Sequence, residues 1–462
     1  MEGSFFVLAL LVVMFFLYNS FNFHLNVDER EHLYASYMVF NGYVPYRDFF
    51  EHHHPLLWYL FAPFLIWFKN SPEIWYVMRG FGVGVNIGIL YFIYKICVFL
   101  GLKKKEAFGG CLLYLGFEAI WNGGIEFRPD NLSVLFEVGG VYYFFEYVKK
   151  RDFGKLIVSY MLFLLSFLVM QKMIFSLIVM GAIILFLPRE NKNIKKEMLC
   201  FLIPLECFVA YLFYLYYAGA LKDYFELNWL LNWELSFYGW LYERFVFIIP
   251  IVMCLIGAVK FRKANYFVRV IILMLWGQVG CALLRAPFIH YLVPVYPFLV
   301  ILLVDMCKKV FDKKLFEVLW VFLLGEVFCM VYLLNLYIGV PLSAYVRLSR
   351  IELEATNEDD EIIPGEVWTG GLRKNALGYY WFGWSIAKLD YKLFKRREFP
   401  DLNRIIEIKK PKIIANNDAI MYSCLSEDNV QNLNKCSPLQ TVDLRVLGDD
   451  YISSDFIHLK VY

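Results

Sequence analysis

The stretch Val27–Pro55, VDEREHLYASYMVFNGYVPYRDFFEHHHP, decides how the chain is interpreted. It holds five acids, two arginines and four histidines, and it lies between a hydrophobic segment at residues 4–21 and an apolar run that begins at Leu56. Ionisable groups beside membrane-length helices cost free energy unless they face water or one another. The stretch is therefore a candidate functional site at a membrane surface.

The composition is that of a polytopic membrane protein. The 462 residues are 60% hydrophobic and 19% aromatic, whereas a soluble domain is about 45–50% apolar. A net charge of +2 argues against a nucleic-acid partner. We interpret the first hydrophobic segment as a retained helix, because it lacks a basic leader and a nearby small-residue cleavage site. Cys424 and Cys436 can pair only if the polar tail lies outside the cytoplasm.

Two rules predict the topology. A helix needs about 20 apolar residues to cross a bilayer, and Lys and Arg are enriched in cytoplasmic loops. Together they predict about eleven spans, at 4–21, 73–100, 106–121, 131–148, 156–170, 173–187, 198–217, 244–259, 267–284, 289–304 and 315–338. Loops rich in Lys and Arg then alternate strictly with loops that contain the candidate site residues. We expect an inner (plasma) membrane protein with a cytoplasmic N-terminus and an extracytoplasmic C-terminus.

The predicted fold class is an all-α polytopic membrane domain, residues 1–339, followed by a small extracytoplasmic α/β domain, residues 340–462. The first outer loop, residues 22–72, contains an apolar segment at Leu56–Phe68 that is too short to span, so we expect a helix lying on the interface. The segment Leu221–Arg244 is similar and is a candidate for a second interfacial helix. In the tail we expect both strands and helices. The strands are Glu366–Trp368, Lys412–Ala415 and Ile457–Val461, and the helices are Ala376–Leu389 and Leu402–Ile408.

Asp28 and Glu29 follow the first span directly. A carboxylate in this position can accept a proton from an attacking hydroxyl or amine. The alternative is structural, with Asp28 as the N-cap of a helix over Glu29–Phe40.

Two clusters follow in the same loop, Tyr46-Arg47-Asp48 and Glu51-His52-His53-His54-Pro55. Such acids and histidines can ligate a divalent metal or contact a phosphate. The alternative is that they are polar surface residues at the membrane interface with no ligand. Adjacent side chains point in different directions, so at most two of the three histidines share one site.

Other outer turns place cations at the ends of separate spans. Glu126–Asp130 forms a turn in which Arg128 can bind a phosphate or pair with Glu126 or Asp130. Lys172 lies in a very short turn, and Arg285, His290 and Tyr291 lie near a later one. Any one of these cations can be explained by snorkelling, in which a long side chain brings its charge to the water at the membrane surface. Their occurrence together on the outer face of the membrane suggests a binding site for a phosphate carried by a lipid. We expect these residues and Asp28 to converge on one pocket.

These residues resemble those of the GT-C class of membrane glycosyltransferases, most of all bacterial relatives of protein O-mannosyltransferases and lipid A aminoarabinose transferases. The resemblance rests on five short motifs and on the layout of spans, large first loop and outer domain. The motifs are Asp28-Glu29, Gly-x-x-Pro-Tyr-Arg-Asp at Gly42–Asp48, His54-Pro55-Leu56, Arg-Pro-Asp at Arg128–Asp130 and Tyr-Leu-x-Pro at Tyr291–Pro294.

The resemblance implies transfer of a sugar from a polyprenyl-phosphate donor to an extracytoplasmic protein, lipid A or cell-surface glycan, with inversion. Asp28 becomes the base and Glu29 its helper. The implied substrate-binding residues are Arg47, Asp48, His53, His54, Arg128, Asp130, Lys172, Arg285, His290 and Tyr291. Relatives often have Lys-Pro-Pro or His-Pro-Pro at His53–Pro55, so it stays open which histidine contacts the phosphate. No cofactor is required, but a divalent metal held by Glu51 and His53 stays open.

Two other functions are compatible with the sequence. A transporter or flippase of a lipid-linked or anionic solute would place charges near the bilayer middle and show repeated, broken helices. The charges here gather on one face, and no internal repeat is visible. A related enzyme that transfers a whole oligosaccharide, or polymerises repeat units, is the second alternative.

Overall fold

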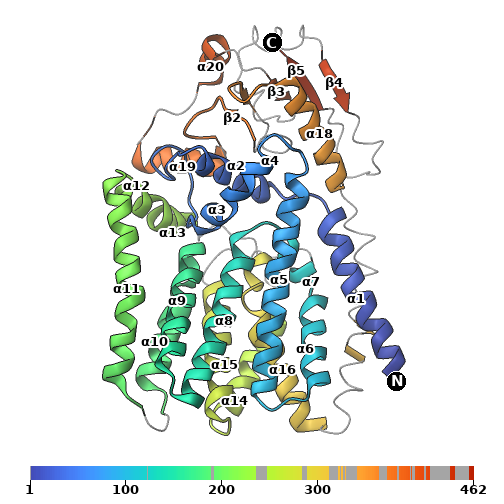
Figure 1. The fold of residues 1–462 in the computed structure, drawn as a ribbon, viewed down its shortest axis with the longest axis vertical. Helices are drawn as coiled ribbons and strands as arrows, with labels where there is room; N and C mark the ends of the chain where they lie inside the picture. Colours follow the sequence, from blue (N-terminus) through green and yellow to red (C-terminus); the bar gives the residue numbers. More distant parts are fainter. Residues whose placement is uncertain are drawn as a thin grey trace. The chain divides into compact units, whose positions relative to one another are not determined.

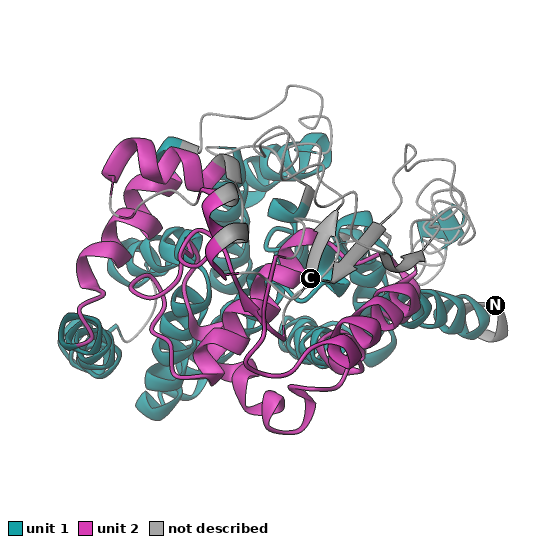
Figure 2. Ribbon diagram, turned by 90° about the horizontal axis from the view of Figure 1, so that it is seen from above, with its two compact units in different colours: residues 1–20, 80–217, 233–335 teal, residues 21–79, 218–232, 336–462 magenta. Residues whose placement is uncertain are grey.

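The computed structural model describes residues 2–121, 123–188, 192–235, 247–283, 289–311, 321–322, 324–325, 328, 341–363, 372–381, 384–395, 397, 401–409, 413–416, 438–442 and 457–461. The chain forms two compact units (Figure 2). Unit 1 contains residues 1–20, 80–217 and 233–335, and unit 2 contains residues 21–79, 218–232 and 336–462. Each unit is therefore assembled from segments that are far apart in the sequence.

Unit 1 is helical in its described parts. Its helices are α1 (Glu2–Asn22), α5 (Ile74–Phe99), α6 (Lys104–Gly116), α7 (Glu118–Trp121), α8 (Pro129–Lys150), α9 (Phe153–Val169), α10 (Ile174–Phe186), α11 (Ile194–Tyr217), α14 (Ile248–Phe261), α15 (Tyr266–Leu283) and α16 (Tyr296–Phe311), of which α1 and α5 each extend into unit 2. Helices α8, α9, α10 and α15 run side by side (Figure 1). Small residues allow this close approach, because a Cβ at Gly140 on α8 would lie 2.9 Å from the Phe163 ring on α9.

These helices overlap the predicted spans where the structure describes them, although α16 begins only at Tyr296, seven residues after the predicted start. Three of the described helices, α5, α11 and α15, are long and apolar enough to cross a membrane, or four if α1 and α2 (Val27–Phe40) count as one broken span. Several others, such as α9 and α14, are apolar but shorter. The number of about eleven spans therefore stays a prediction, and the span predicted at 315–338 falls largely outside the described residues.

Unit 2 contains the first loop. After α2 come α3 (Leu56–Phe61), a 3-10 turn η1 (Ala62–Phe64) and α4 (Leu65–Phe68), so the segment predicted as an interfacial helix is helical throughout. Its residues Ile66 and Trp67 are exposed, at 60% and 71%, as expected of a helix with an apolar outer side. The second segment of this kind forms α12 (Leu221–Phe225), a π-helical turn η4 (Glu226–Leu231) and α13 (Asn232–Leu235), which continues into unit 1 after Asn232.

The described residues of the tail add three helices and a mixed sheet to unit 2. The helices are α18 (Leu342–Ala355), α19 (Trp384–Phe394) and α20 (Leu402–Lys409), and the strands are β1 (Glu361–Ile363), β2 (Lys374–Asn375), β3 (Ile413–Asn416), β4 (Pro438–Val442) and β5 (Ile457–Val461). The strand order is β2-β1-β3-β5-β4. β1 pairs parallel with β2 and β3, whereas β5 pairs antiparallel with β3 and β4.

The predicted strands near Lys412 and Ile457 and the predicted helix at Leu402–Ile408 are present. The strand predicted at Glu366–Trp368 and the pair Cys424 and Cys436 lie outside the described residues. The 339/340 domain boundary stays a prediction.

The helix predicted at Ala376–Leu389 is wrong in its first half, because α19 begins only at Trp384. The Asn375 side chain accepts a hydrogen bond from the Leu377 amide at 2.9 Å. Gly378 has a left-handed backbone, with φ +75°. An Asx turn followed by a left-handed glycine bends the chain away from a helix, and residues 375–381 instead pack against the first loop.

Candidate functional site

Helix α2 begins the site in unit 2. Asn26 is its N-cap, and the Glu29 carboxylate completes a capping box by accepting from the Asn26 amide. The proposed alternative for Asp28, that it caps this helix, is therefore wrong. Asp28 lies in the first turn and is half-buried.

Glu29 is engaged in the protein core. Its carboxylate lies 2.6 Å from the Arg79 guanidinium, and both side chains are 0% exposed. Arg79 also donates to the main-chain carbonyl of His24 at 2.8 Å. A buried pair of this kind fixes the start of α2 against α5, which favours Glu29 as a residue that positions Asp28 rather than one that touches a substrate.

Arg47 and Asp48 neutralise each other. Arg47 Nε and Nη2 each donate to an Asp48 oxygen at 2.7 Å, and Nη1 donates to the Ala218 carbonyl at 2.9 Å. Burial opposes ionisation of Asp48, but the hydrogen bonds from Arg47 and from the Val44 amide lower its pKa. The Arg47 side chain is 41% exposed, so any anion that it binds must share it with Asp48.

Two carboxylates and two imidazoles form a compact buried cluster, which we call the Glu31–His53 cluster: Glu31, Glu51, His52 and His53. Their ligand atoms all lie within 4.8 Å of one another. His53 Nδ1 lies 3.3 Å from Glu51 Oε1 and 3.4 Å from Glu31 Oε1, and His52 Nδ1 lies 3.8 Å from the same Glu31 oxygen.

This geometry fits a divalent metal. Ligand atoms in a tetrahedral zinc site, with bonds of about 2.0–2.1 Å, lie about 3.4 Å apart, which is close to two of the three distances above. Buried Glu31 Oε1 also has no hydrogen bond of good geometry. Carboxylate oxygen and imidazole nitrogen are both ordinary ligands of Zn²⁺. All four residues fit a metal, two more than the predicted pair of Glu51 and His53.

The electrostatics of the Glu31–His53 cluster show why its carboxylates need such a partner. Burial raises the pKa of Glu51 to about 7, and the charge of Asp28 adds to this effect. Burial, followed by the charge of Glu51, raises the pKa of Glu31 well above its usual value. Without a cation both carboxyls hold their protons to a higher pH than usual, because two adjacent buried charges are unfavourable.

His54 faces away from the Glu31–His53 cluster. It is fully buried, and its Nε2 lies 3.1 Å from the Tyr224 hydroxyl on α12. The expectation that at most two of the three histidines share a site agrees with this arrangement. A metal or substrate at the cluster contacts His52 and His53, while His54 joins the first loop to α12.

Unit 1 holds a second group of predicted residues. Arg128, at the N-terminus of α8, lies 3.4 Å from both Glu126 and Asp130. Lys172 lies in the turn η3 (Gln171–Met173), and its Nζ is 3.2 Å from the centroid of the Tyr291 ring. The His290 ring contacts Tyr291 edge-on at 4.5 Å.

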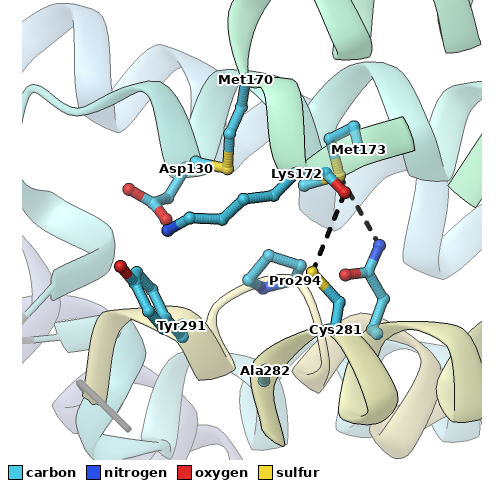
Figure 3. A pocket seen from close by; sticks show the side chains of 9 residues that line it. Asp130, Met170, Lys172, Met173, Cys281, Ala282, Tyr291 and Pro294 are labelled. Carbon is cyan, nitrogen blue, oxygen red and sulfur yellow. Dashed lines mark hydrogen bonds between the residues drawn. The ribbon is translucent and has the colours of Figure 1, made fainter. Parts of the chain in front are cut away.

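Asp130, Lys172 and Tyr291 line one small cavity of about 10 Å³, a space that is at the lower limit for holding a single water molecule. Figure 3 shows the Lys172 side chain extending toward the Asp130 carboxylate across this cavity. Gln278 and Cys281 of α15 line it from the other side. Arg285 lies outside the described residues. The expected convergence of Asp28 with these cations joins two separately described units and stays a prediction.

Sequence reasoning missed Glu31 as a ligand candidate, and it named His52 only as a member of the Glu51–Pro55 cluster. A signal for Glu31 was present, because residues three apart share a helix face and Glu31 follows Asp28 by three. The position of His52 relative to Glu31 depends on the path of the loop, which no local pattern encodes.

Comparison with known proteins gives a fold and a family match over part of the chain. Residues 52–217 match the family model of dolichyl-phosphate-mannose-protein mannosyltransferase. No curated protein sequence matches the chain. Three solved structures with similar folds share little sequence. ArnT from Cupriavidus metallidurans bound to undecaprenyl phosphate has a TM-score of 0.63 at 10% identity, covering 99% of this chain and 98% of that one.

The other two structures agree with this result. The apo state of the same ArnT gives a TM-score of 0.62 at 11% identity over 99% and 98% of the two chains. The archaeal oligosaccharyltransferase AglB from Archaeoglobus fulgidus, in complex with an inhibitory peptide and a dolichol-phosphate, gives 0.51 at 11% identity over 90% and 69%. The resemblance predicted from the first loop is thus confirmed at the level of the fold: the chain has the fold of ArnT and AglB, and the family model of dolichyl-phosphate-mannose-protein mannosyltransferase matches part of it.

Proposed function

We propose that the protein is an integral membrane glycosyltransferase of the plasma membrane that transfers one sugar from a polyprenyl-phosphate donor to an extracytoplasmic acceptor. The observation that carries this proposal is the Glu31–His53 cluster beside Asp28, placed in the first loop of a GT-C fold. The acceptor is a protein, lipid A or a cell-surface glycan.

The reaction is a single displacement. The acceptor oxygen attacks the anomeric carbon, the bond from that carbon to the phosphate oxygen breaks, and the proton of the acceptor passes to the Asp28 carboxylate. The configuration inverts, and polyprenyl phosphate leaves with the bonding electrons. Because phosphate is already a good leaving group, the site needs a base and positive charge more than a strong acid.

We assign the donor phosphate to Lys172, with Arg128 as a second cation. Lys172 is held by the Tyr291 ring rather than by a tight ion pair with a carboxylate among the contacts described. A divalent metal, held by Glu31, Glu51, His52 and His53, would supply further positive charge for the reaction.

A large apolar groove in unit 1 supports a lipid donor. It has a volume of about 420 Å³ and is lined by α9, α10 and α11. Its lining is apolar apart from the Tyr160 hydroxyl and includes Phe163, Phe167 and Phe208. We assign the isoprenoid tail of the donor to this groove.

Asp28→Asn should lower turnover by about 10²–10⁴-fold, because a general base is lost. Donor affinity should stay within about twofold, since Asp28 is not one of the assigned phosphate ligands. The assay uses purified protein, short-chain polyprenyl-phosphate sugars and a panel of acceptors. Asp359→Asn, at an exposed position, is the matched control. Full turnover in Asp28→Asn rules out Asp28 as the base.

Lys172→Met should weaken binding of polyprenyl phosphate about tenfold, because a charge-assisted hydrogen bond is lost. Binding is measured with a short-chain analogue, so that the tail contributes little. The control is Lys222→Met, whose side chain is 85% exposed. Equal affinities in the two variants would remove Lys172 from the phosphate site.

Gly181→Leu should weaken binding of long-chain donors about tenfold. The leucine side chain displaces methylene groups of the isoprenoid tail from the apolar groove, and each displaced group costs about 0.8 kcal/mol of binding free energy. Affinity for short-chain donors should not change. A Cβ at Gly181 meets no atom within 4 Å, and the same is true of Gly280 on α15, which gives the control Gly280→Leu. Loss of affinity irrespective of chain length contradicts the assignment of the tail.

Glu51 makes metal-free stability depend on pH. Its pKa is about 7 in the folded state and about 4.3 when unfolded. Between these values the folded state holds a proton that the unfolded state has lost. The free energy of unfolding should therefore fall as pH rises from about 4.5 to about 7, by up to about 1.4 kcal/mol per unit. Thermal unfolding in chelator measures this fall.

Glu51→Gln should flatten that pH dependence and also abolish stabilisation by added Zn²⁺, because one ligand and one titrating group are lost together. Glu234→Gln, at an exposed position on α13, should behave as the wild type. Stabilisation by Zn²⁺ that survives in Glu51→Gln would show that the metal binds elsewhere.

A further inference from the structure

A seven-residue segment of the tail, Asn375–Trp381, packs on the loop that carries the metal-ligand candidates. We call it the clamp segment. The Phe50 amide donates to the Tyr379 carbonyl at 2.9 Å, and Trp381 Nε1 donates to the Phe50 carbonyl at 3.0 Å. Phe50 directly precedes Glu51 and is 1% exposed. Both of its main-chain groups are therefore paired with the clamp segment.

Tyr46 connects the clamp segment to the other end of residues 46–53, which we call the ligand loop. The Tyr379 hydroxyl donates to the Tyr46 carbonyl at 2.8 Å, and the Tyr46 hydroxyl donates to the His53 carbonyl at 2.8 Å. Tyr46 has φ 71°, a left-handed conformation that is costly for an aromatic residue and persists only when its surroundings impose it. The clamp segment thus supports both flanks of Glu51–His53.

The clamp segment also contacts α2, which carries Asp28 and Glu31. The Asn375 amide donates to the Tyr34 hydroxyl at 3.0 Å, and the Tyr34 and Trp381 rings lie 4.2 Å apart. The Asn375 side chain in turn donates to the Trp381 carbonyl at 3.2 Å. One segment is therefore joined to both elements that supply the four ligand candidates.

We propose that the clamp segment positions Glu51, His52 and His53 relative to Glu31. The tail thereby holds the ligand loop in the geometry that a metal needs. Metal ligands must be held within about 0.2 Å of their bonding distances, and partners outside the ligand set commonly provide this precision. Within residues 44–50 the local main-chain hydrogen bonds run from the Tyr46 amide to the Phe49 carbonyl at 3.1 Å and from the Asp48 amide to the Val44 carbonyl at 3.0 Å, and neither involves Glu51, His52 or His53. The expected effect on turnover rests on the proposed function, whereas the expected support of the ligand loop by the clamp segment does not.

Tyr379→Phe and Trp381→Phe in the full-length protein test the clamp segment, because each removes one donor and keeps an aromatic ring. Both should weaken Zn²⁺ binding by about tenfold or more. Hydrogen exchange of peptides covering residues 46–54 should accelerate about tenfold. Turnover should fall and recover at high Zn²⁺. Tyr391→Phe and Trp233→Phe are matched controls, since these residues are 40% and 66% exposed.

Unchanged exchange at residues 46–54 together with unchanged Zn²⁺ affinity in both variants overturns the proposal. If Trp381→Phe accelerates exchange throughout the protein, it reports unfolding, and the isosteric Tyr379→Phe decides. If the wild type neither binds Zn²⁺ nor transfers a sugar, the proposed function fails, and exchange at residues 46–54 alone decides on the clamp segment. If the wild type is active and both variants match it, only the clamp proposal fails.

Discussion

The burial of two carboxylates side by side is the constraint on which the first loop depends. Glu31 and Glu51 are 2% and 1% exposed, and charging both without a counterion costs several kcal/mol. The structure places two imidazoles against them and brings the chain into position through α2, the ligand loop and the clamp segment. An arrangement this unfavourable for stability alone is typical of a binding or catalytic site.

Adjacent acids receive opposite environments, which separates their roles. Glu29 is paired with Arg79 and is sealed from solvent, so its charge is compensated within the protein. Asp28 is half-buried, lies in the same helical turn, and acts on the pKa of Glu51. Different surroundings of neighbouring carboxyls commonly divide the work of a site between them. The ion pair holds the helix, and the neighbouring carboxylate of Asp28 is the one to which we assign the proton transfer.

Strong local patterns made part of this structure predictable. Long apolar runs located the helices, and the charge content of residues 27–55 identified the candidate site. What the sequence left open or predicted wrongly depended on contacts between distant residues. His52 and His53 rather than His54 enter the Glu31–His53 cluster because of how the loop turns after Phe50. The helix expected from Ala376 is replaced by a turn that packs against residues 46–50, more than 300 positions earlier. A propensity rule has no access to such a partner, and tertiary contacts override it.

The predicted cations differ in how readily they can take up a phosphate. Arg47 makes a bidentate pair with Asp48 at 2.7 Å, so an incoming anion must compete with a bond of optimal length. Arg128 divides its donors between two carboxylates at 3.4 Å, longer than charge-assisted bonds usually are. Lys172 rests on an aromatic face, an interaction of about 0.5–2 kcal/mol that a phosphate can add to rather than replace. Because the cost of recruiting each cation rises in the order Lys172, Arg128, Arg47, a lipid phosphate should engage Lys172 first.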